Sequence, residues 1–207
     1  KKFKIIKIPS GEIASYSYLK YLAKFNKKLI LSTGMATIYE IKRAINHLVK
    51  YGTYRKNISI LQCNTEYPTP FEDLNINVIP ELKKKLKLRV GLSDHSHGIL
   101  APILAISKGA SIIEKHITLN KNMDGPDHKA SLEPKEFFNM VKNIRIAEKA
   151  FGNKDKKITK SERKNIKIAR KSIVAKKNIL KGQKFSFSNL TEKRTGKGTG
   201  TFNIIKL

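Results

Sequence analysis

Two histidines, His95 and His116, each stand at or just past the end of a short apolar run. Both runs read as consecutive strands of a parallel sheet, in which neighbouring strands lie about 5 Å apart. Two imidazoles at matching strand ends could share one divalent metal ion, with water or carboxylate at its other positions. They could equally be ordinary hydrogen-bonded residues, and the spacing alone does not decide. His97 and His128 are possible substitutes as ligands, and His47 lies on a predicted helix where a structural role is expected.

A second group of candidate residues belongs to the first predicted strand and the turn after it. Lys7 interrupts an apolar strand, where an ammonium without a partner is costly, so we expect it to face an anion or the mouth of a barrel. The hydroxyl of Ser10 and the accessible backbone amide of Gly11 suit a phosphate or a carboxylate. Glu12 could hydrogen-bond a sugar hydroxyl or act as a general acid or base. A strand-end turn with a solvated Glu12 explains the same spacing about as well.

Acidic residues accompany the histidines. Asp94 and Glu114 each come directly before or two residues before a histidine, and either could orient an imidazole. Asp127 falls in a long loop, and long loops at the top of a barrel are often functional. A turn aspartate is the alternative, since Asp is common after Pro. The single cysteine, Cys63, excludes an internal disulfide framework and a cysteine-built zinc site, and we expect it in the core of a protein from a reducing cytoplasm.

The elements that must position these residues alternate between strand and helix with a repeat of about thirty residues. Short apolar runs predict strands at residues 3–8, 28–32, 58–63, 90–93 and 111–116. Amphipathic or apolar segments predict helices at residues 16–25, 38–50, 78–85, 99–107 and 134–151. Apolar runs without alternation fit parallel strands buried on both faces. The pattern predicts an α/β fold, either a doubly wound open sheet or a (β/α)8 barrel.

The polar residues favour the barrel, because they cluster immediately after the strands. In a barrel these strand ends converge on one active-site face. No G-x-G-x-x-G sequence follows any strand, which weakens the dinucleotide-binding alternative. We therefore predict a partial TIM barrel of about the last five βα units in residues 1–151. Because the chain opens directly on a strand, we expect preceding sequence to be missing.

A different composition marks the rest of the chain. Residues 152–171 are rich in Lys and polar side chains and are interpreted as a linker. Residues 172–207 predict a small β-rich module, with short strands at 172–175, 184–187 and 189–194. This module is too small to have much core of its own, so we expect it to dock on another surface.

The formal net charge of the 207-residue chain is +27, which raises the possibility of a non-catalytic, polyanion-binding module. The lysines are spread along the whole chain, whereas bidentate phosphate recognition favours Arg. No zinc-finger, basic-zipper or RNA-recognition motif accompanies them. We interpret the charge as a composition bias and expect no specific nucleic-acid partner, although the positive field would attract an anionic substrate. No apolar run is long enough to span a bilayer, so no membrane partner is expected.

Six strings of residues, in this order and spacing, resemble the sialic acid synthase (N-acetylneuraminate synthase) family. They are Lys7-Ile-Pro-Ser-Gly-Glu12, Leu31-Ser-Thr-Gly-Met-Ala36, Gln62-Cys-Asn-Thr-Glu-Tyr-Pro68, Gly91-Leu-Ser-Asp-His95, Ile113-Glu-Lys-His116 and Gly125-Pro-Asp-His-Lys-Ala-Ser-Leu-Glu-Pro134. Further strings resemble the family's linker and its C-terminal antifreeze-like (SAF) domain, namely Ser161-Glu-Arg163, Ala169-Arg-Lys-Ser-Ile-Val-Ala175 and Lys193-Arg194. The resemblance covers nearly all of the chain.

The resemblance implies a (β/α)8 barrel followed by an antifreeze-like domain, usually in a domain-swapped homodimer. It implies a metal-dependent transferase that condenses phosphoenolpyruvate with N-acetylmannosamine or a related N-acetylated amino sugar, giving a sialic (nonulosonic) acid and phosphate. The string Glu66-Tyr67-Pro68 with Pro70-Phe71-Glu72 looks closer to the neuraminate and legionaminate branch than to the pseudaminate branch.

Roles carry over position by position. His95 and His116 would bind Mn²⁺ or Mg²⁺, and Glu12 and Lys7 would be catalytic. The substrate contacts that the resemblance implies are, for phosphoenolpyruvate, Lys7, Ser10, Ser93, Asn64 and Thr65; for the amino sugar, Glu12, Tyr67 and Asp127; and for the N-acetyl group in the partner subunit's site, Arg194.

The sequence departs from the family pattern in two places. The first three βα units are absent, and the chain after Gly200 falls short of the usual domain. Both departures leave the activity of this chain by itself open. The alternatives are an inactive fragment of such an enzyme, or the basic module described above.

Overall fold

The computed structural model describes residues 3–202. The chain divides into two compact units at the boundary between Gly152 and Asn153. Each unit is described separately below. Within the described residues, no helix is both long enough and apolar enough to cross a membrane.

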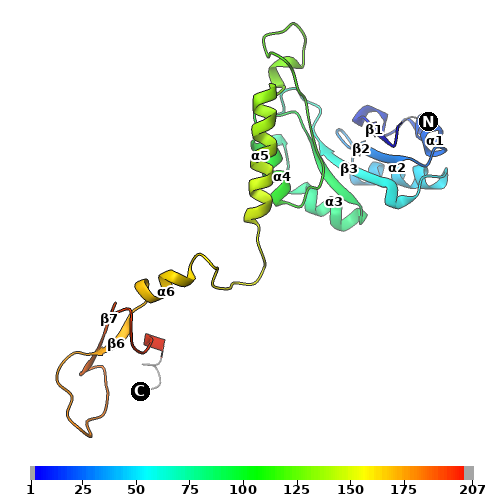
Figure 1. Cartoon of the computed structure of the whole chain (residues 1–207). Coiled ribbons are helices and arrows are strands. Elements are labelled where there is room, and N and C mark those ends of the chain that lie inside the picture. Colours follow the sequence, from blue (N-terminus) through cyan, green and yellow to red (C-terminus); the bar gives the residue numbers. More distant parts are fainter. Residues whose placement is uncertain (1–2, 203–207) are drawn as a thin grey trace. The chain divides into compact units, whose positions relative to one another are not determined.

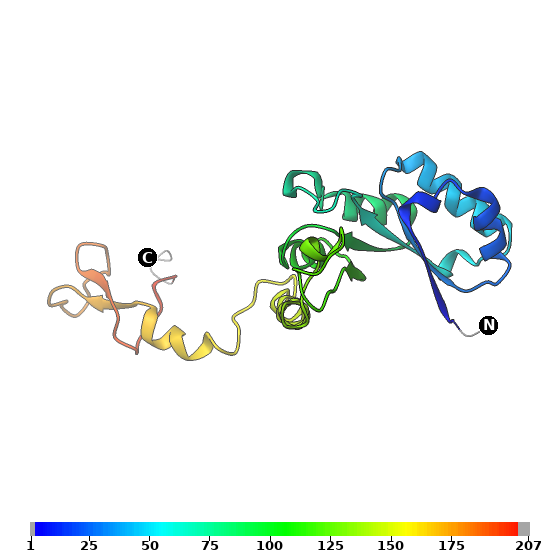
Figure 2. The same ribbon diagram turned by 90° about the horizontal axis from the view of Figure 1, so that it is seen from above.

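A curled, five-stranded parallel sheet forms the centre of the first unit (Figure 1 and Figure 2). Its strands follow one another in sequence order, and all neighbouring pairs are parallel. The strands are β1 (Ile5–Ile8), β2 (Lys28–Ser32), β3 (Ile58–Cys63), β4 (Arg89–Asp94) and β5 (Ile113–Lys115). Sequential parallel order with a helix after each strand is the arrangement of a TIM barrel. The predicted α/β fold with a partial barrel is confirmed for this unit.

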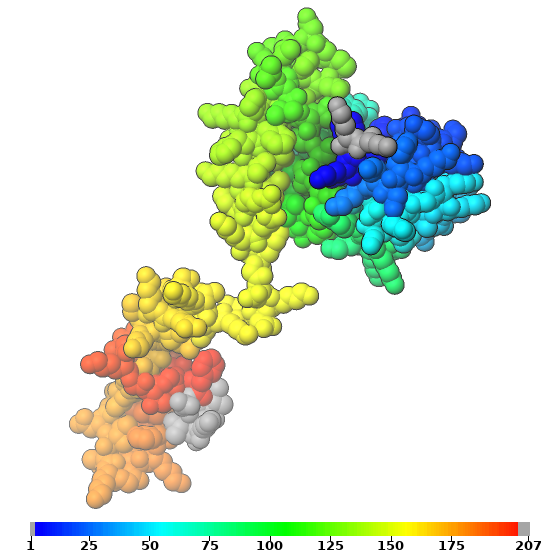
Figure 3. Space-filling model, turned by 45° about the vertical axis from the view of Figure 1, so that its right-hand side comes forward, coloured from blue at the N-terminus to red at the C-terminus, as the bar shows by residue number. Residues whose placement is uncertain are grey.

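A helix follows each strand of the sheet. They are α1 (Tyr16–Ala23), α2 (Ile38–Lys50), α3 (Val78–Leu86), α4 (Leu100–Ser107) and α5 (Pro134–Ala150). Single 3₁₀ turns lie at η1 (Ser10–Glu12), η2 (Arg55–Asn57), η3 (Phe71–Asp73) and η4 (His128–Ala130). Figures 1 and 3 show α5 on one side of this unit and α1 and α2 on the opposite side.

Local sequence explains why these helices begin where they do. In α2, the Thr37 hydroxyl accepts from the Glu40 amide, while the Glu40 carboxylate accepts from the Thr37 amide at 2.7 Å, a reciprocal capping box. The pKa of Glu40 is lowered, chiefly by its hydrogen bond to the Thr37 hydroxyl. In α5, Pro134 occupies the first turn, where its missing N–H has no intrahelical partner to lose.

The main apolar core lies between the sheet and the helices, and a second, smaller cluster contains Leu132, Met140 and Ile144. The side chains of Leu29, Leu31, Ile58 and Ile60 in the central strands are fully buried, with relative exposures of 0–1 %. Nearly every residue of β3 is buried, which is what a parallel strand covered on both faces requires. Burial of side chains of this size contributes about 1.5–3 kcal/mol each.

Two element boundaries differ from the prediction in ways that bear on the site. The first strand begins at Ile5, and the fifth is only Ile113–Lys115. The ladder between β4 and β5 ends where Asp94 pairs with Lys115. Residues 95 and 116 therefore lie just beyond the paired backbone.

The second unit contains a helix and a two-stranded antiparallel sheet. Helix α6 (Arg163–Ala169) lies inside the segment predicted as a linker. The turn that precedes this helix is closed by the Thr159 amide, which donates to the Glu162 carboxylate at 2.9 Å. Strands β6 (Ser172–Ala175) and β7 (Leu190–Lys193) pair with each other.

The predicted strand at residues 184–187 was wrong. The side chain of Asn189, which is buried, donates to the Lys184 carbonyl at 2.9 Å and accepts from the Ser186 amide at 2.9 Å. These bonds satisfy the backbone within a loop in place of a strand ladder. Residues 203–207 of the predicted β-rich module lie outside the described residues.

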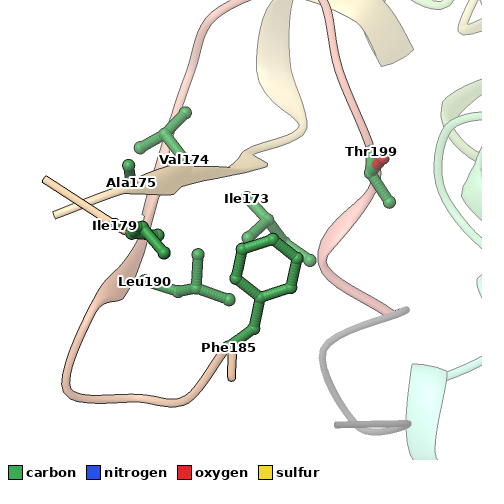
Figure 4. A pocket seen from close by; sticks show the side chains of 7 residues that line it. All are labelled: Ile173, Val174, Ala175, Ile179, Phe185, Leu190 and Thr199. Atoms are coloured by element: carbon green, nitrogen blue, oxygen red, sulfur yellow. The ribbon is translucent and has the colours of Figure 1, made fainter. Parts of the chain in front are cut away.

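An apolar hollow of about 430 Å³ opens in this small unit (Figure 4). Its walls are formed by Ile173, Val174, Ala175, Ile179, Phe185, Leu190 and Thr199. Phe185 is about half exposed, so the unit leaves apolar surface in solvent. Such surface in a small β unit fits the expectation that it docks elsewhere.

Candidate active site

A cavity of about 310 Å³ lies at the carboxyl ends of the sheet strands. Each of the five strands contributes one lining residue, in order Lys7, Ser32, Cys63, Ser93 and Glu114. The segments that follow the strands add Pro9, Ser10, Gly11, Thr65, Tyr67, His95 and His116. In parallel barrels this end of the sheet is where active sites are built.

Strand register explains why the two histidines face the same space. Ser93 pairs with Glu114, and Asp94 pairs with Lys115, across β4 and β5. Successive side chains of a strand point to opposite faces. Ser93 and Glu114 therefore line the cavity with the histidines, whereas Asp94 and Lys115 point to the other face and are fully buried.

Three aromatic rings meet at the cavity. The centroids of His95 and His116 lie 5.2 Å apart, with the ring planes at 81°. Tyr67 stacks on His95 at 4.0 Å and lies 5.3 Å from His116. The sequence placed both imidazoles at strand ends, and the structure brings the two rings side by side.

Hydrogen bonds fix the form of His95. Its Nδ1 lies 2.6 Å from the carbonyl oxygen of Asn64, which can only accept, so Nδ1 carries the proton. The lone pair is then on Nε2, where the Tyr67 hydroxyl donates at 3.0 Å. Burial is the main cause that lowers the pKa of His95 and so favours the neutral ring. A neutral imidazole with an unprotonated Nε2 is the form that binds metals.

The Tyr67 hydroxyl is affected by the same environment. Burial raises the pKa of Tyr67 most, and the charges of Cys63, Asp127 and Glu114 raise it further. The phenol therefore keeps its proton and acts as a donor. Asn64 contributes its main chain to this cluster, while its side-chain oxygen accepts from the Glu66 amide at 2.7 Å.

Asp127 approaches the second histidine. Its Oδ2 lies 3.6 Å from Nδ1 of His116, on the side of the ring away from Nε2. The loop that carries it is held by the Ser131 hydroxyl, which donates to the Asp127 carbonyl at 2.7 Å. A carboxylate in this place can orient an imidazole.

The other histidines lie elsewhere among the described residues. His128 contacts the Thr118 hydroxyl at 2.7 Å within its own loop, and His97 is exposed. His47 contacts the main-chain oxygen of Tyr16 at 2.8 Å. None of the three lines the cavity.

A charged network occupies one wall. The Lys7 ammonium lies 3.2 Å from Glu114 Oε1, and the Ser93 hydroxyl donates to the same oxygen at 2.6 Å. The prediction that Asp94 or Glu114 orients an imidazole was wrong. Glu114 holds Lys7 and Ser93, and strand alternation turns Asp94 to the opposite face, where it pairs with Lys115.

The wall near β2 is closely packed. The Gly34 amide donates to the Ser10 hydroxyl at 2.9 Å. A Cβ on Gly34 would lie 2.6 Å from Thr65 Cγ2 and 2.9 Å from Ser10 Oγ, so only glycine fits. Ser32 Oγ, also on this wall, is buried and has no hydrogen-bond partner among the described residues.

A buried hydroxyl without a partner calls for an explanation, and its place on the cavity wall makes Ser32 a candidate ligand contact. Sequence reasoning did not select Ser32 as a site residue, although the polar residue at the end of an apolar strand was the available signal.

Four predicted site residues do not line the cavity within the described part of the chain. Asn64 and Asp127 lie beside it through their contacts with His95 and His116, whereas Glu12 and Arg194 are not gathered there. Glu12 ends the η1 turn, is half-buried and does not line the cavity. Arg194 lies in the second unit, where its Nε donates to the Ala169 carbonyl at 3.2 Å. Their catalytic and substrate-binding roles stay predictions.

The residues at the cavity suit a metal ion that takes only some of its ligands from the protein. Two imidazoles can supply two ligands, His95 through the lone pair on Nε2. Among residues 3–202, no group of three or more His, Cys, Asp or Glu side chains could hold a metal ion. Other positions would be filled by water or substrate oxygens, as is usual for hard divalent cations.

Comparisons with known proteins agree with this geometry. The model described as the NeuB family matches residues 1–156. The chain is 56 % identical to the N,N'-diacetyllegionaminic acid synthase of Campylobacter jejuni over 94 % of its own length and 58 % of that protein's. It is 39 % identical to the pseudaminic acid synthase of the same strain, over 93 % of this chain and 55 % of that one.

A solved structure shows the same likeness. The N-acetylneuraminic acid synthetase of Leptospira borgpetersenii, in complex with citrate, superposes with a TM-score of 0.72 at 34 % identity. The match covers 80 % of this chain and 57 % of that one. The chain thus spans somewhat more than half the length of the relatives it matches.

Proposed function

This chain belongs to the NeuB family, and from that premise we propose that it carries the active-site face of a nonulosonic acid synthase. The proposed reaction condenses phosphoenolpyruvate with an N-acetylated amino sugar and one water in the presence of Mn²⁺ or Mg²⁺, giving a sialic-type acid and phosphate. The enol carbon bonds to the aldehyde carbon, water adds to the resulting cationic carbon, and phosphate leaves. The observation that carries the proposal is the single cavity onto which Lys7, His95 and His116 all open.

The acceptor proposed is the amino-sugar precursor of N,N'-diacetyllegionaminic acid. The identity of 56 % to a legionaminic acid synthase, against 39 % to the pseudaminic acid synthase of the same strain, supports this choice. The motif around Tyr67 supports it as well. N-Acetylmannosamine is the alternative acceptor.

Phosphoenolpyruvate would bind at the wall formed by Lys7, Ser10 and Ser32. The Lys7 ammonium is held by Glu114, and an incoming phosphate or carboxylate would compete for it. The unpartnered hydroxyl of Ser32 could donate to the same anion. Ser93 and Thr65 line the adjoining wall, so hydroxyl groups surround the position proposed for the anion. Fixed donors of this kind stabilise charge without reorganising during the reaction.

The imidazoles of His95 and His116 would hold the divalent ion, which when bound polarises the sugar aldehyde as a Lewis acid. The Asn64 carbonyl keeps the lone pair of His95 on Nε2, and Asp127 faces the Nδ1 side of His116. The Tyr67 hydroxyl, now 3.0 Å from that Nε2, would turn toward the amino sugar. These residues thus orient two substrates for attack of the enol carbon on the carbonyl carbon.

Several further roles are proposed by family membership. Glu12 would act as general acid or base. The second unit would be an antifreeze-like (SAF) domain, and its Arg194 would reach the N-acetyl group in the partner subunit of a domain-swapped homodimer. The chain spans 58 % of the length of its legionaminate relative, so these roles concern the whole protein. We propose a cytoplasmic location for the reaction.

Binding measurements on the chain itself test the proposal. Mn²⁺ is titrated and the free ion is followed by electron paramagnetic resonance. Wild type is expected to bind one Mn²⁺, and His95→Ala and His116→Ala are each expected to weaken binding by at least about 10-fold. His97→Ala, which changes an exposed histidine away from the cavity, is the matched control.

Product formation is then measured by phosphate release from phosphoenolpyruvate with each acceptor. Equal Mn²⁺ affinity in wild type and both cavity variants would refute the metal assignment. Binding of Mn²⁺ and phosphoenolpyruvate without turnover would favour the inactive-fragment alternative. Tight, sequence-selective binding of duplex DNA at physiological salt would instead favour the basic module.

A further inference from the structure

A buried ion pair lies directly behind the two histidines. The Lys115 ammonium donates to Asp94 Oδ2 at 2.7 Å, and both side chains are fully buried. The pair lies on the face of the sheet opposite the cavity, because Asp94 and Lys115 alternate with the residues that line it. Neither side chain is therefore placed to touch a substrate. Buried charges are destabilising unless they are paired and fully hydrogen-bonded, so this arrangement constrains the backbone closely.

The hydrogen bonds of the pair reach both sides of one histidine. Lys115 Nζ also donates to the main-chain carbonyl of Ser96. Asp94 Oδ1 accepts from the Ser96 amide at 2.9 Å and from the Ser96 hydroxyl at 2.7 Å. The residues immediately before and after His95 are thus joined to the residue immediately before His116.

This cluster of Asp94, Ser96 and Lys115 links the two chain segments at the point where the backbone pairing of β4 and β5 ends. The β4–β5 ladder ends at the Asp94–Lys115 pair. Beyond it, the carbonyls of residues 95 and 116 accept from the amides of Thr69 and Leu132, at 3.1 and 2.9 Å. Those two amides belong to different loops, so their bonds do not tie the histidines to each other. The Asp94–Ser96–Lys115 cluster does tie the two segments together.

We infer that Lys115 is a positioning residue of the metal site, which sets the separation of the His95 and His116 rings from behind the sheet. The inference rests on the proposed function for its consequence, namely metal affinity. Its structural part, the ring separation, can be measured without a metal. Loss of the ammonium would release Ser96 and the end of β5, and the rings would no longer be held 5.2 Å apart.

The test uses a variant that leaves no buried charge unpaired. Lys115→Met alone would strand the Asp94 carboxylate in the interior. The double variant Asp94→Asn/Lys115→Met removes both charges, and neutral replacements of buried pairs are often tolerated. The matched control is Lys121→Met, which breaks the half-exposed 2.7 Å pair between Lys121 and Glu136.

The first readout is the nuclear Overhauser contacts among the ring protons of Tyr67, His95 and His116 in the metal-free chain. We expect them in wild type and in Lys121→Met, and expect the His95–His116 contact to be lost in the double variant. The second readout is the dissociation constant for Mn²⁺, expected to rise about 10-fold in the double variant and to stay within twofold in the control.

Retention of the His95–His116 contact in a folded double variant would overturn the inference. A wild type that shows the contact but binds no Mn²⁺ would overturn the proposed function alone, and the ring contacts would still decide the role of Lys115. Should circular dichroism show the double variant unfolded, Asp94→Leu/Lys115→Met gives the same comparison with an apolar pair in place of the charges. It also removes the Lys115 bonds to Asp94 and Ser96, and an unchanged ring contact there would overturn the inference as well.

Discussion

The substitution Gly34→Ala tests how closely the cavity wall is packed. The added Cβ would lie 2.6 Å from Thr65 Cγ2 and 2.9 Å from Ser10 Oγ, both closer than non-bonded carbon contacts allow. Overpacking of this kind destabilises by about 1–3 kcal/mol. Moving Ser10 away also endangers the 2.9 Å bond from the Gly34 amide, worth about 1 kcal/mol. We therefore expect a loss of about 2–4 kcal/mol in the free energy of unfolding of the first unit.

Urea denaturation followed by circular dichroism measures that free energy. The control is Gly11→Ala, because a Cβ at Gly11 has no atom within 4 Å. This control should unfold at the same urea concentration as wild type or at a slightly higher one, since alanine reduces the conformational entropy of the unfolded chain. Because Ser10 and Thr65 both line the cavity, Gly34→Ala should also weaken binding of phosphoenolpyruvate. Equal midpoints for Gly34→Ala and Gly11→Ala would refute the packing argument.

Three further outcomes follow from single contacts. The pKa of Glu136 is lowered in the folded protein, chiefly by its hydrogen bond from the Lys121 ammonium. The ionised carboxylate therefore stabilises the fold at pH values above the unfolded pKa, and this stabilisation is lost as the pH falls through the folded pKa. Glu136→Gln should therefore flatten the acid side of a melting-temperature profile, and an unchanged profile would contradict this. Gly91→Ala should destabilise β4 more than Gly34→Ala does, because its Cβ would collide with the main-chain carbonyl oxygen of Ile112, and a milder effect in urea would count against it. Asn189→Ala should cost about 1–3 kcal/mol locally and speed amide exchange in residues 176–189, since it strips two loop hydrogen bonds; exchange rates equal to wild type would disprove that role.

The alternation of side chains along β4 and β5 organises the whole site. Cavity-facing positions carry Ser93 and Glu114 and are followed by the two histidines, whereas the positions between them carry the buried ion pair. Chemistry and positioning thus occupy opposite faces of the same two strands. A substitution on the hidden face is therefore expected to alter the site without touching a substrate.

Much of the fold was predictable because its signals are local. The strands Lys28–Ser32 and Ile58–Cys63 and the helix Ile38–Lys50 have the bounds that their apolar patterns predicted. The linker segment was not fully predicted, since it contains the helix α6, which has no side-chain cap to mark its start. The strand expected at residues 184–187 failed because a single side chain, Asn189, satisfies the backbone of that loop.

The sequence by itself determined which residues stand at the strand ends. Lys7, Ser10, His95 and His116 were identified from type and position, Thr65, Tyr67 and Ser93 from the family resemblance, and all seven line the cavity. The sequence of a single strand does not determine which residues of the neighbouring strand it pairs with. Only the tertiary structure decided that Glu114 holds Lys7, that Asp94 turns away from the histidines, and that Lys115 is buried against it. The physical reason is that register across a sheet fixes which alternating side chains become neighbours, and register depends on the packing of the whole unit.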